Sequence, residues 1–254
     1  VKLDETTGDD HSQSSRDSAG TATGSSSGIA RPTRLTKSVD IFALGCLFFY
    51  VLTNGGHPFG DRFEREVNIL KNERRLEGLD QFGEEGSEAV DLISSMLEPE
   101  ADHRPDTTTT LAHPYFWDPG RRLAFLQDAS DRFEIMCRDP RDPGLVALEE
   151  NAINVVGPDW PSRLDKVFVE NLGKFRKYDP RSVQDLLRAL RNKKHHYQDL
   201  PENVKRHVGS MPDGYLQYFT RRFPRLFLHA HSVIANSSLR HESMFRSYFD
   251  VRDS

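Results

Sequence analysis

The sequence predicts an all-α fold. No segment alternates apolar and polar side chains for long enough to require a β-strand, whereas apolar residues recur at helical spacing in many segments. Prolines and glycines interrupt the chain at short intervals, as expected for helices joined by turns. With 36% hydrophobic and 29% charged residues among 254, the composition is typical of a folded protein that buries a core.

Residues 1–35 differ in composition from the rest. Between residues 6 and 27 the chain is rich in Ser, Thr, Gly and Asp and has almost no apolar side chain. Such a segment cannot offset the entropy lost on ordering. We therefore expect residues 1–35 to be a flexible region that precedes the first folded domain.

The strongest helix prediction covers Val39 to Leu52, which is apolar on nearly every face. Ser38 is a candidate N-cap, and Asn54-Gly55-Gly56 follows the expected end. The apolar run 41–52 has 12 residues, whereas a membrane span needs roughly 20, so we expect a buried helix and no membrane segment. Shorter helices are expected at 61–72, 87–97 and 107–112.

Pro119-Gly120 is expected to interrupt the chain, and we place a domain boundary there. The predicted domains are therefore 36–118 and 119–254. In the second domain, apolar residues at helical spacing predict a series of helices. These helices are expected at 121–137, 145–152, 164–171, 182–191 or beyond, 201–207, 212–222, 224–235 and 241–248.

Two cysteines are too few for a disulfide scaffold, and neither has metal-ligand spacing. Cys46 lies in the apolar run, which favours a packed side chain over a reactive thiol. The net charge of −5 argues against a protein covered in basic residues for indiscriminate nucleic-acid binding. Any nucleic-acid site must therefore be local.

One local segment carries the positive charge that a nucleic-acid site needs. From Lys174 to Lys194 there are eight basic and two acidic residues, a balance of about +6, which is typical of a phosphate-binding surface. Val183, Leu186, Leu187 and Leu190 predict the buried stripe of a helix. The opposite face would direct Arg188, Arg191 and Asn192 outward and, if the helix continues, would make Asn192 and His196 neighbours at i and i+4.

These residue types suit RNA cleavage without a metal ion. RNA supplies its own nucleophile, the 2′-hydroxyl, so cleavage needs a base, an acid for the leaving 5′-oxygen, and donors for the charged phosphate. A Tyr phenol near cations can act as the base, a His as the acid, and Arg with Asn as the donors. From composition alone, a solvated or phosphate-contacting helix face remains an alternative.

Residues 36–118 resemble the C-terminal lobe of a protein kinase. The similarity rests on Ser38-Val39-Asp40-Ile41-Phe42-Ala43-Leu44-Gly45, Gly56-His57-Pro58-Phe59, His103-Arg104-Pro105 and His113-Pro114-Tyr115-Phe116-Trp117. The resemblance implies structural roles for Asp40, which would hold the catalytic-loop backbone, and Arg104, which would pair with a Glu of an A-P-E motif. Residues 28–33 stand where A-P-E is expected and lack that Glu.

The motifs for phosphoryl transfer are missing from this sequence. It has no Gly-rich phosphate loop, no V-A-I-K lysine, no H-R-D loop and no D-F-G. The nucleotide site is therefore not present in this chain, and ATP with magnesium is expected only in a complete parent kinase.

Residues 119–250 resemble the kinase-extension nuclease domain of the inositol-requiring unfolded-protein-response sensor, with ribonuclease L as the nearest alternative. The similarity rests on Arg191-Asn192-Lys193-Lys194-His195-His196-Tyr197 with Tyr178 upstream, and on residues 212–224. It implies that Tyr178 is the general base or a substrate-positioning phenol, that His196 is the general acid, and that Arg191 and Asn192 hold the scissile phosphate. No metal or cofactor is expected for this cleavage. The predicted RNA-binding residues are Lys174, Arg176, Lys177, Arg188, Lys193, Lys194 and His195.

The resemblance also implies a setting for the parent protein. It would be an endoplasmic-reticulum membrane protein whose catalytic half faces the cytosol, act as a homodimer or higher oligomer, and splice messenger RNA by cutting stem-loops to 2′,3′-cyclic phosphate ends. A catalytically silent, pseudokinase-like interaction module is the alternative from another class.

Overall fold

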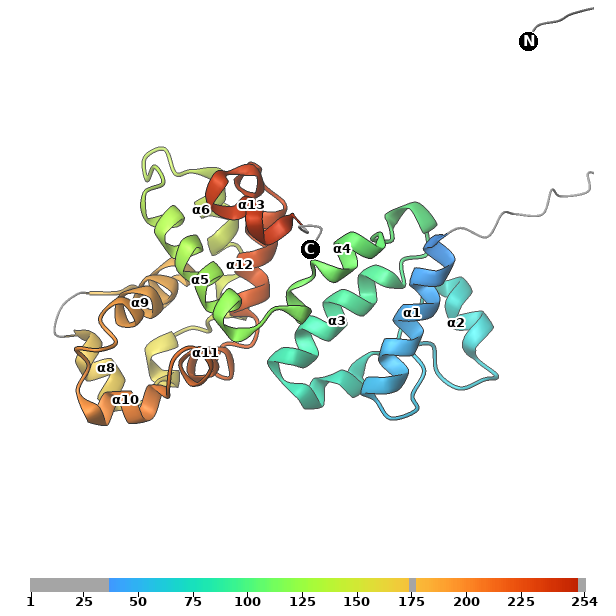
Figure 1. The fold of residues 1–254 in the computed structure, drawn as a ribbon, viewed down its shortest axis with the longest axis horizontal. Helices are drawn as coiled ribbons and strands as arrows, with labels where there is room; N and C mark the ends of the chain where they lie inside the picture. The colour runs from blue at the N-terminus through green and yellow to red at the C-terminus, as the bar shows by residue number, and fades with distance from the viewer. Residues whose placement is uncertain (1–36, 174–176, 251–254) are drawn as a thin grey trace, which may run out of the picture. The chain divides into compact units, whose positions relative to one another are not determined.

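A computed structural model describes residues 37–173 and 177–250 (Figure 1). The described residues belong to one compact unit. Within the described ranges the chain is helical and contains no strand, only an isolated bridge between Arg138 and Arg141. The all-α prediction is confirmed. The flexibility predicted for residues 1–35 lies outside the described residues.

Residues 37–118, the described part of the chain before residue 119, contain four helices. They are α1 (Lys37–Leu52), α2 (Arg65–Lys71), α3 (Glu84–Met96) and α4 (Thr107–Leu111), with 3₁₀ turns at Glu77–Phe82, Ala101–His103 and Pro114–Phe116. Helix α1 lies against α3, where Ile41 packs with Leu92 and Met96 (Figure 1). Gly45 permits this approach, because a Cβ there would lie 3.0 Å from the Cβ of Met96.

Two of the predicted helix boundaries before residue 121 are wrong. Ser38 lies inside the first turn of α1, because the helix begins at Lys37, and its carbonyl accepts a hydrogen bond from Arg104. The helix expected at 121–137 begins at Pro119, so Pro119-Gly120 belongs to its first turn and does not precede it. Asp118 caps that helix by accepting a hydrogen bond from Arg121 N at 3.0 Å, and proline is favoured at the first helical position because its missing N–H would have no partner there.

From residue 119 onward, the described residues form α5 and eight further helices. The elements are α5 (Pro119–Glu134), α6 (Pro143–Glu149), α7 (Ala152–Val155), α8 (Lys166–Gly173), α9 (Val183–His195), α10 (Glu202–Val208), α11 (Asp213–Thr220), α12 (Leu226–Ala235) and α13 (Ser243–Phe249). The 3₁₀ turns in this region are Trp160–Arg163 and Ser238–His241. Each predicted helix has a counterpart, and only the four-residue α7 and the 3₁₀ turns were not predicted.

One continuous apolar core runs through these later helices. Phe125, Phe133, Phe168, Phe219 and Phe227 are fully buried in it. The core also takes in Trp117, which precedes α5, so side-chain packing does not separate the chain cleanly at the predicted 118/119 boundary. The boundary itself stays a prediction.

Buried charges connect α3 with α5. Glu88 has no exposed surface, and its carboxylate pairs with the guanidinium of Arg122. Glu84 lies 3.6 Å from the same guanidinium. Burial raises the pKa of Glu84 and lowers that of Arg122. These groups therefore depend on one another, since an unpaired buried charge is costly.

None of the helices in the described ranges is both long and apolar enough to cross a bilayer. Cys46, on α1, packs against a small apolar cluster, and burial raises the pKa of its thiol. The protonated thiol is the less reactive form.

Candidate active site

Helix α9 carries the segment that the sequence singles out, and its N-terminus is firmly anchored. Ser182 caps the helix by accepting a hydrogen bond from Asp185 N at 3.1 Å. Glu149 accepts hydrogen bonds from Ser182 Oγ at 2.6 Å, Val183 N at 3.0 Å and Gln184 N at 3.1 Å. A carboxylate at a helix N-terminus satisfies free N–H groups and the helix dipole.

The predicted apolar stripe of α9 is confirmed. Val183, Leu186, Leu187 and Leu190 are fully buried in the main core. This burial fixes the rotation of the helix about its axis, so the polar residues at 188, 191 and 192 occupy the remaining faces.

Three of the four predicted catalytic residues are joined by direct contacts. Asn192 Nδ2 donates a hydrogen bond to the Tyr178 hydroxyl at 3.2 Å. Arg191 Nη1 donates one to Asn192 Oδ1 at 3.1 Å. The guanidinium of Arg188 lies 5.2 Å from the centre of the Tyr178 ring, and Trp160 packs edge-on against that ring. A phenol, an amide and two guanidinium groups therefore form one cluster.

The fourth residue, His196, stands at the end of α9. The helix ends at His195, and the backbone N–H of His196 donates to the carbonyl of Asn192 at 3.2 Å, which places His196 one turn after Asn192. The imidazole is 73% exposed, and its Nδ1 lies 3.6 Å from Asp199 Oδ2. It is accessible to a substrate and lies beside a carboxylate.

The expectation that Arg188 and Arg191 point outward is wrong. The side chain of each is only 16% exposed because both lie against acidic residues of α5. Arg191 Nε is 3.0 Å from Asp131 Oδ1, and Arg188 Nη1 is 3.6 Å from Glu134 Oε1. Sequence reasoning missed these carboxylates, which offset part of the local positive charge. Their spacing at i and i+3 places them on one face of α5 but does not connect them with α9.

The predicted RNA-binding residues have different placements. Lys193 is buried, and its Nζ contacts both Asn171 oxygens, so we correct its predicted role from RNA contact to a packed side chain. Lys194 Nζ donates to Gln127 Oε1, and the Gln127 amide nitrogen lies 2.7 Å from His195 Nε2. Lys177 is exposed, whereas Lys174 and Arg176 lie outside the described residues.

The two residues with expected kinase-like structural roles, Arg104 and Asp40, lie in different surroundings. Arg104 donates to the carbonyls of Glu98, Ser38 and Pro99 at 2.6, 2.9 and 3.0 Å and lies over the ring of Phe42. It thus ties the start of α1 to the turn after α3 without an acidic partner among the described residues. Asp40 is exposed in the first turn of α1.

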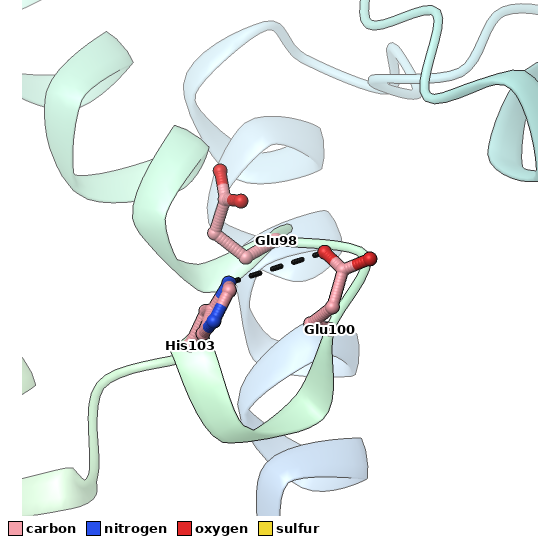
Figure 2. A group of neighbouring side chains, drawn as sticks. All are labelled: Glu98, Glu100 and His103. Carbon is pink, nitrogen blue, oxygen red and sulfur yellow. Dashed lines mark ion pairs between the residues drawn. The ribbon is translucent and has the colours of Figure 1, made fainter.

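A separate group has the residue types of a metal site. Potential ligand atoms of Glu98, Glu100 and His103 lie within 4.8 Å of one another (Figure 2). However, Glu98 is already paired with Arg74 at 2.9 Å, while Glu100 and His103 are exposed and 4.0 Å apart. The group is remote in sequence from α9, and we make no metal proposal for it.

The described residues form an all-helical protein in which α9 brings Arg191 and Asn192 into contact with Tyr178. The Ribonuclease 2-5A family model matches residues 122–249, and the chain belongs to this family. Its relatives include three proteins of similar identity. The Serine/threonine-protein kinase/endoribonuclease IRE1 of Hypocrea jecorina is 49% identical over 229 residues, which are 89% of this chain and 18% of that protein. The Sensor for unfolded proteins in the ER ire1 of Schizosaccharomyces pombe is 47% identical over 220 residues, 87% of this chain and 20% of that protein. The Serine/threonine-protein kinase/endoribonuclease IRE2 of Homo sapiens is 44% identical over 218 residues, 86% of this chain and 23% of that protein.

This similarity confirms the resemblance to the unfolded-protein-response sensor family and favours it over ribonuclease L. The chain spans about a fifth of the length of these relatives.

Proposed function

We propose that this chain is an endoribonuclease that cleaves RNA stem-loops by attack of the 2′-hydroxyl, without a metal ion, in messenger-RNA splicing during the unfolded-protein response. The observation that carries the proposal is the hydrogen-bonded series Tyr178, Asn192 and Arg191, with the exposed imidazole of His196 one helical turn away. The endoribonuclease names of relatives that are 44–49% identical support the same reaction class.

In the proposed reaction, the 2′-oxygen forms a bond to phosphorus as its proton passes to a base, and the bond from phosphorus to the 5′-oxygen breaks as that oxygen takes a proton from an acid. The products are a 2′,3′-cyclic phosphate and a free 5′-hydroxyl. Tyr178 contacts the 2′-hydroxyl and His196 protonates the leaving oxygen. Arg191 and Asn192 bind the phosphate oxygens, whose negative charge grows in the transition state.

Tyr178 is proposed as the base, with the role of a positioning phenol as the alternative. Asn192 donates to the phenol oxygen, and the Arg188 guanidinium lies over the ring. These contacts hold the phenol beside the residues proposed to bind the phosphate. Asp199 Oδ2 lies 3.6 Å from Nδ1 of the His196 imidazole, which is proposed as the acid.

The proposal extends to the setting of the parent protein. We propose that a complete parent contains a serine/threonine kinase domain that uses ATP and magnesium, resides in the endoplasmic-reticulum membrane with this portion in the cytosol, and acts as a homodimer or higher oligomer. The printed names of the relatives, which include kinase and sensor for unfolded proteins in the ER, support the kinase and the compartment. Because this chain lacks the nucleotide-binding motifs, its own cleavage should be weak.

The test is cleavage of a hairpin RNA in EDTA by the 254-residue chain and by His196→Ala and Tyr178→Phe. Each variant should lose about 10²- to 10⁴-fold in rate, the usual contribution of a general acid or base. The matched controls His207→Ala and Tyr50→Phe alter exposed residues elsewhere and should cleave normally. A Tyr178→Phe chain that keeps its full rate would contradict a role for the phenol in proton transfer.

Three results would count against the proposal. Cleavage abolished by EDTA would indicate a metal-dependent enzyme. Full activity of a measured monomer would contradict the need for assembly. RNA binding without cleavage at any protein concentration, unchanged by His196→Ala, would indicate an interaction module.

A further inference from the structure

Helices α5 and α9 meet along a ladder of polar contacts. Gln127, Asp131 and Glu134 of α5 are spaced by about one helical turn, so they share a face. They contact Lys194 and His195, then Arg191, then Arg188, in the reverse order along α9. The two helices therefore run antiparallel, and each polar residue of α5 holds a basic residue of the proposed RNA site.

The middle contact of this ladder involves the group nearest the proposed chemistry. Asp131 Oδ1 lies 3.0 Å from Arg191 Nε, although the N–H does not point at an acceptor, so the contact is an ion pair and not an aligned hydrogen bond. Asp131 occupies the Nε edge of the guanidinium and leaves Nη1 to donate to Asn192 Oδ1. The carboxylate thus selects which edge of Arg191 faces the site.

The orientation of Asn192 follows from that edge. A guanidinium only donates hydrogen bonds, so the amide oxygen of Asn192 must face Arg191. The amide NH₂ then faces the opposite way and donates to the Tyr178 hydroxyl at 3.2 Å. If Arg191 turned, the Asn192 amide could rotate and the donor to Tyr178 would be lost.

We propose that Asp131 is a positioning residue of the RNA-cleaving site, which holds Arg191 so that Arg191 fixes the side-chain amide of Asn192 toward Tyr178. The inference rests on the proposed function. Asp131 touches neither Tyr178 nor Asn192 in any contact recorded for the described residues, so it acts through Arg191.

If Asp131 only stabilised the fold, its removal would lower the melting temperature; if it positions Arg191, its removal should lower the cleavage rate instead. The side chain of Asp131 is 37% exposed, and ion pairs at such positions contribute little to stability. Removal of the carboxylate also leaves the site more positive, so RNA should bind as well as before or more tightly. Loss of positioning should therefore lower the cleavage rate while the melting temperature and RNA affinity are maintained.

The first experiment compares Asp131→Ala with the parent chain by single-turnover cleavage and by binding of the same hairpin with a 2′-deoxy nucleotide at the cut. The rate should fall about 10- to 100-fold, as expected for a misplaced group, with affinity unchanged or tighter. Asp131→Glu, which keeps the charge, should recover part of the rate. The control Asp128→Ala makes the same charge change on the same helix and should cleave normally. Asp128 Oδ2 accepts a hydrogen bond from the Tyr248 hydroxyl at 2.7 Å, away from Arg191.

The second experiment is a double-mutant cycle with Arg191→Lys. If Asp131 acts through Arg191, Asp131→Ala should cost little further rate in the Arg191→Lys chain. Fully additive losses, or equal losses of affinity and rate, would overturn the proposal, as would a normal rate in Asp131→Ala.

A third measurement does not depend on cleavage. In the parent chain, nitrogen-15 NMR should show a distinct Arg191 Nε–H signal and a restrained Asn192 amide, and both should become averaged in Asp131→Ala but not in Asp128→Ala. A parent that cleaves no RNA refutes the proposed function, whereas unchanged NMR signals in Asp131→Ala refute the positioning role.

Discussion

Residues 119–250 and residues 37–116 use their apolar side chains in different ways. The later region buries one continuous core, including seven fully buried phenylalanines. The earlier region buries only two small clusters, one around Phe49 and Phe59 and one around Ile41. It also leaves large apolar side chains in contact with solvent, with Leu70 87%, Phe63 80% and Val51 67% exposed.

The difference shows which region covers most of its apolar surface with its own residues and which leaves that surface open. Helix α1 is apolar nearly all round, which is typical of a helix covered on every side, yet Leu47 and Val51 line an open apolar pocket with Phe116. Contiguous exposed apolar surface favours association with other apolar surface. The later region also exposes some apolar side chains, such as Ile135 and Ile153, but it buries a much larger core and contains the proposed chemistry.

The largest expected effect tests this contrast directly. Phe125 is fully buried and contacts Trp117, Phe227 and Tyr248, so Phe125→Ala should lower the free energy of unfolding by about 3–5 kcal/mol through lost burial and a residual cavity. Phe63→Ala removes the same type of side chain from an exposed site and should change the free energy of unfolding by less than about 0.5 kcal/mol. Urea denaturation measures both. Similar losses in the two variants would show that the two regions are packed alike.

A somewhat smaller effect is expected where the two regions connect. Arg122→Ala should cost about 3 kcal/mol, because it leaves the carboxylate of Glu88 buried without its partner. Arg122→Met combined with Glu88→Gln should recover part of the loss. Circular dichroism and tryptophan fluorescence should follow one unfolding transition in the parent and two in Arg122→Ala. A loss below about 1 kcal/mol would mean that the pair is well solvated.

The smallest of these effects is a dependence on pH that arises in the larger core. Burial among the rings of Trp117, Phe125 and Phe249 lowers the pKa of His231 to about 4, with a smaller contribution from His113. Below pH 6.5 the unfolded chain takes up a proton that the folded chain does not accept until near pH 4. Stability therefore falls with decreasing pH across this window, by about 2 kcal/mol between pH 7 and pH 5.

The matched variant for that prediction is His231→Phe, which keeps an aromatic ring and removes the titrating group. Its stability should fall less steeply between pH 7 and pH 5 in urea denaturation measured at each pH. An identical slope in both chains would assign the dependence to other groups.

Much of the helical fold was predictable because the signals are local. Apolar periodicity located the helices, and the Ser182 cap and the buried stripe of α9 are present as expected. The errors at Ser38 and Pro119 have a local cause as well. A serine and a Pro-Gly pair are both compatible with more than one position at a helix start, and packing decides between them.

The site was predictable only in part. Tyr178, Arg191 and Asn192 are joined as the predicted cluster requires, while the catalytic roles remain predictions. Lys193 was misjudged because a charged residue on a basic helix is usually solvated, and only the fold shows Asn171 beside it. Asp131 was missed because nothing in its own neighbourhood in the sequence connects it with Arg191.

The sequence by itself determined the helices, the family resemblance and the residue types that suit RNA cleavage, because periodicity, caps and short motifs act over a few residues. Only the tertiary structure decided which charges remain available. Arg188 and Arg191 acquire carboxylate partners from α5, more than fifty residues earlier in the chain. Ion pairs depend on distance in space, and that distance is set by how the buried faces of two helices pack.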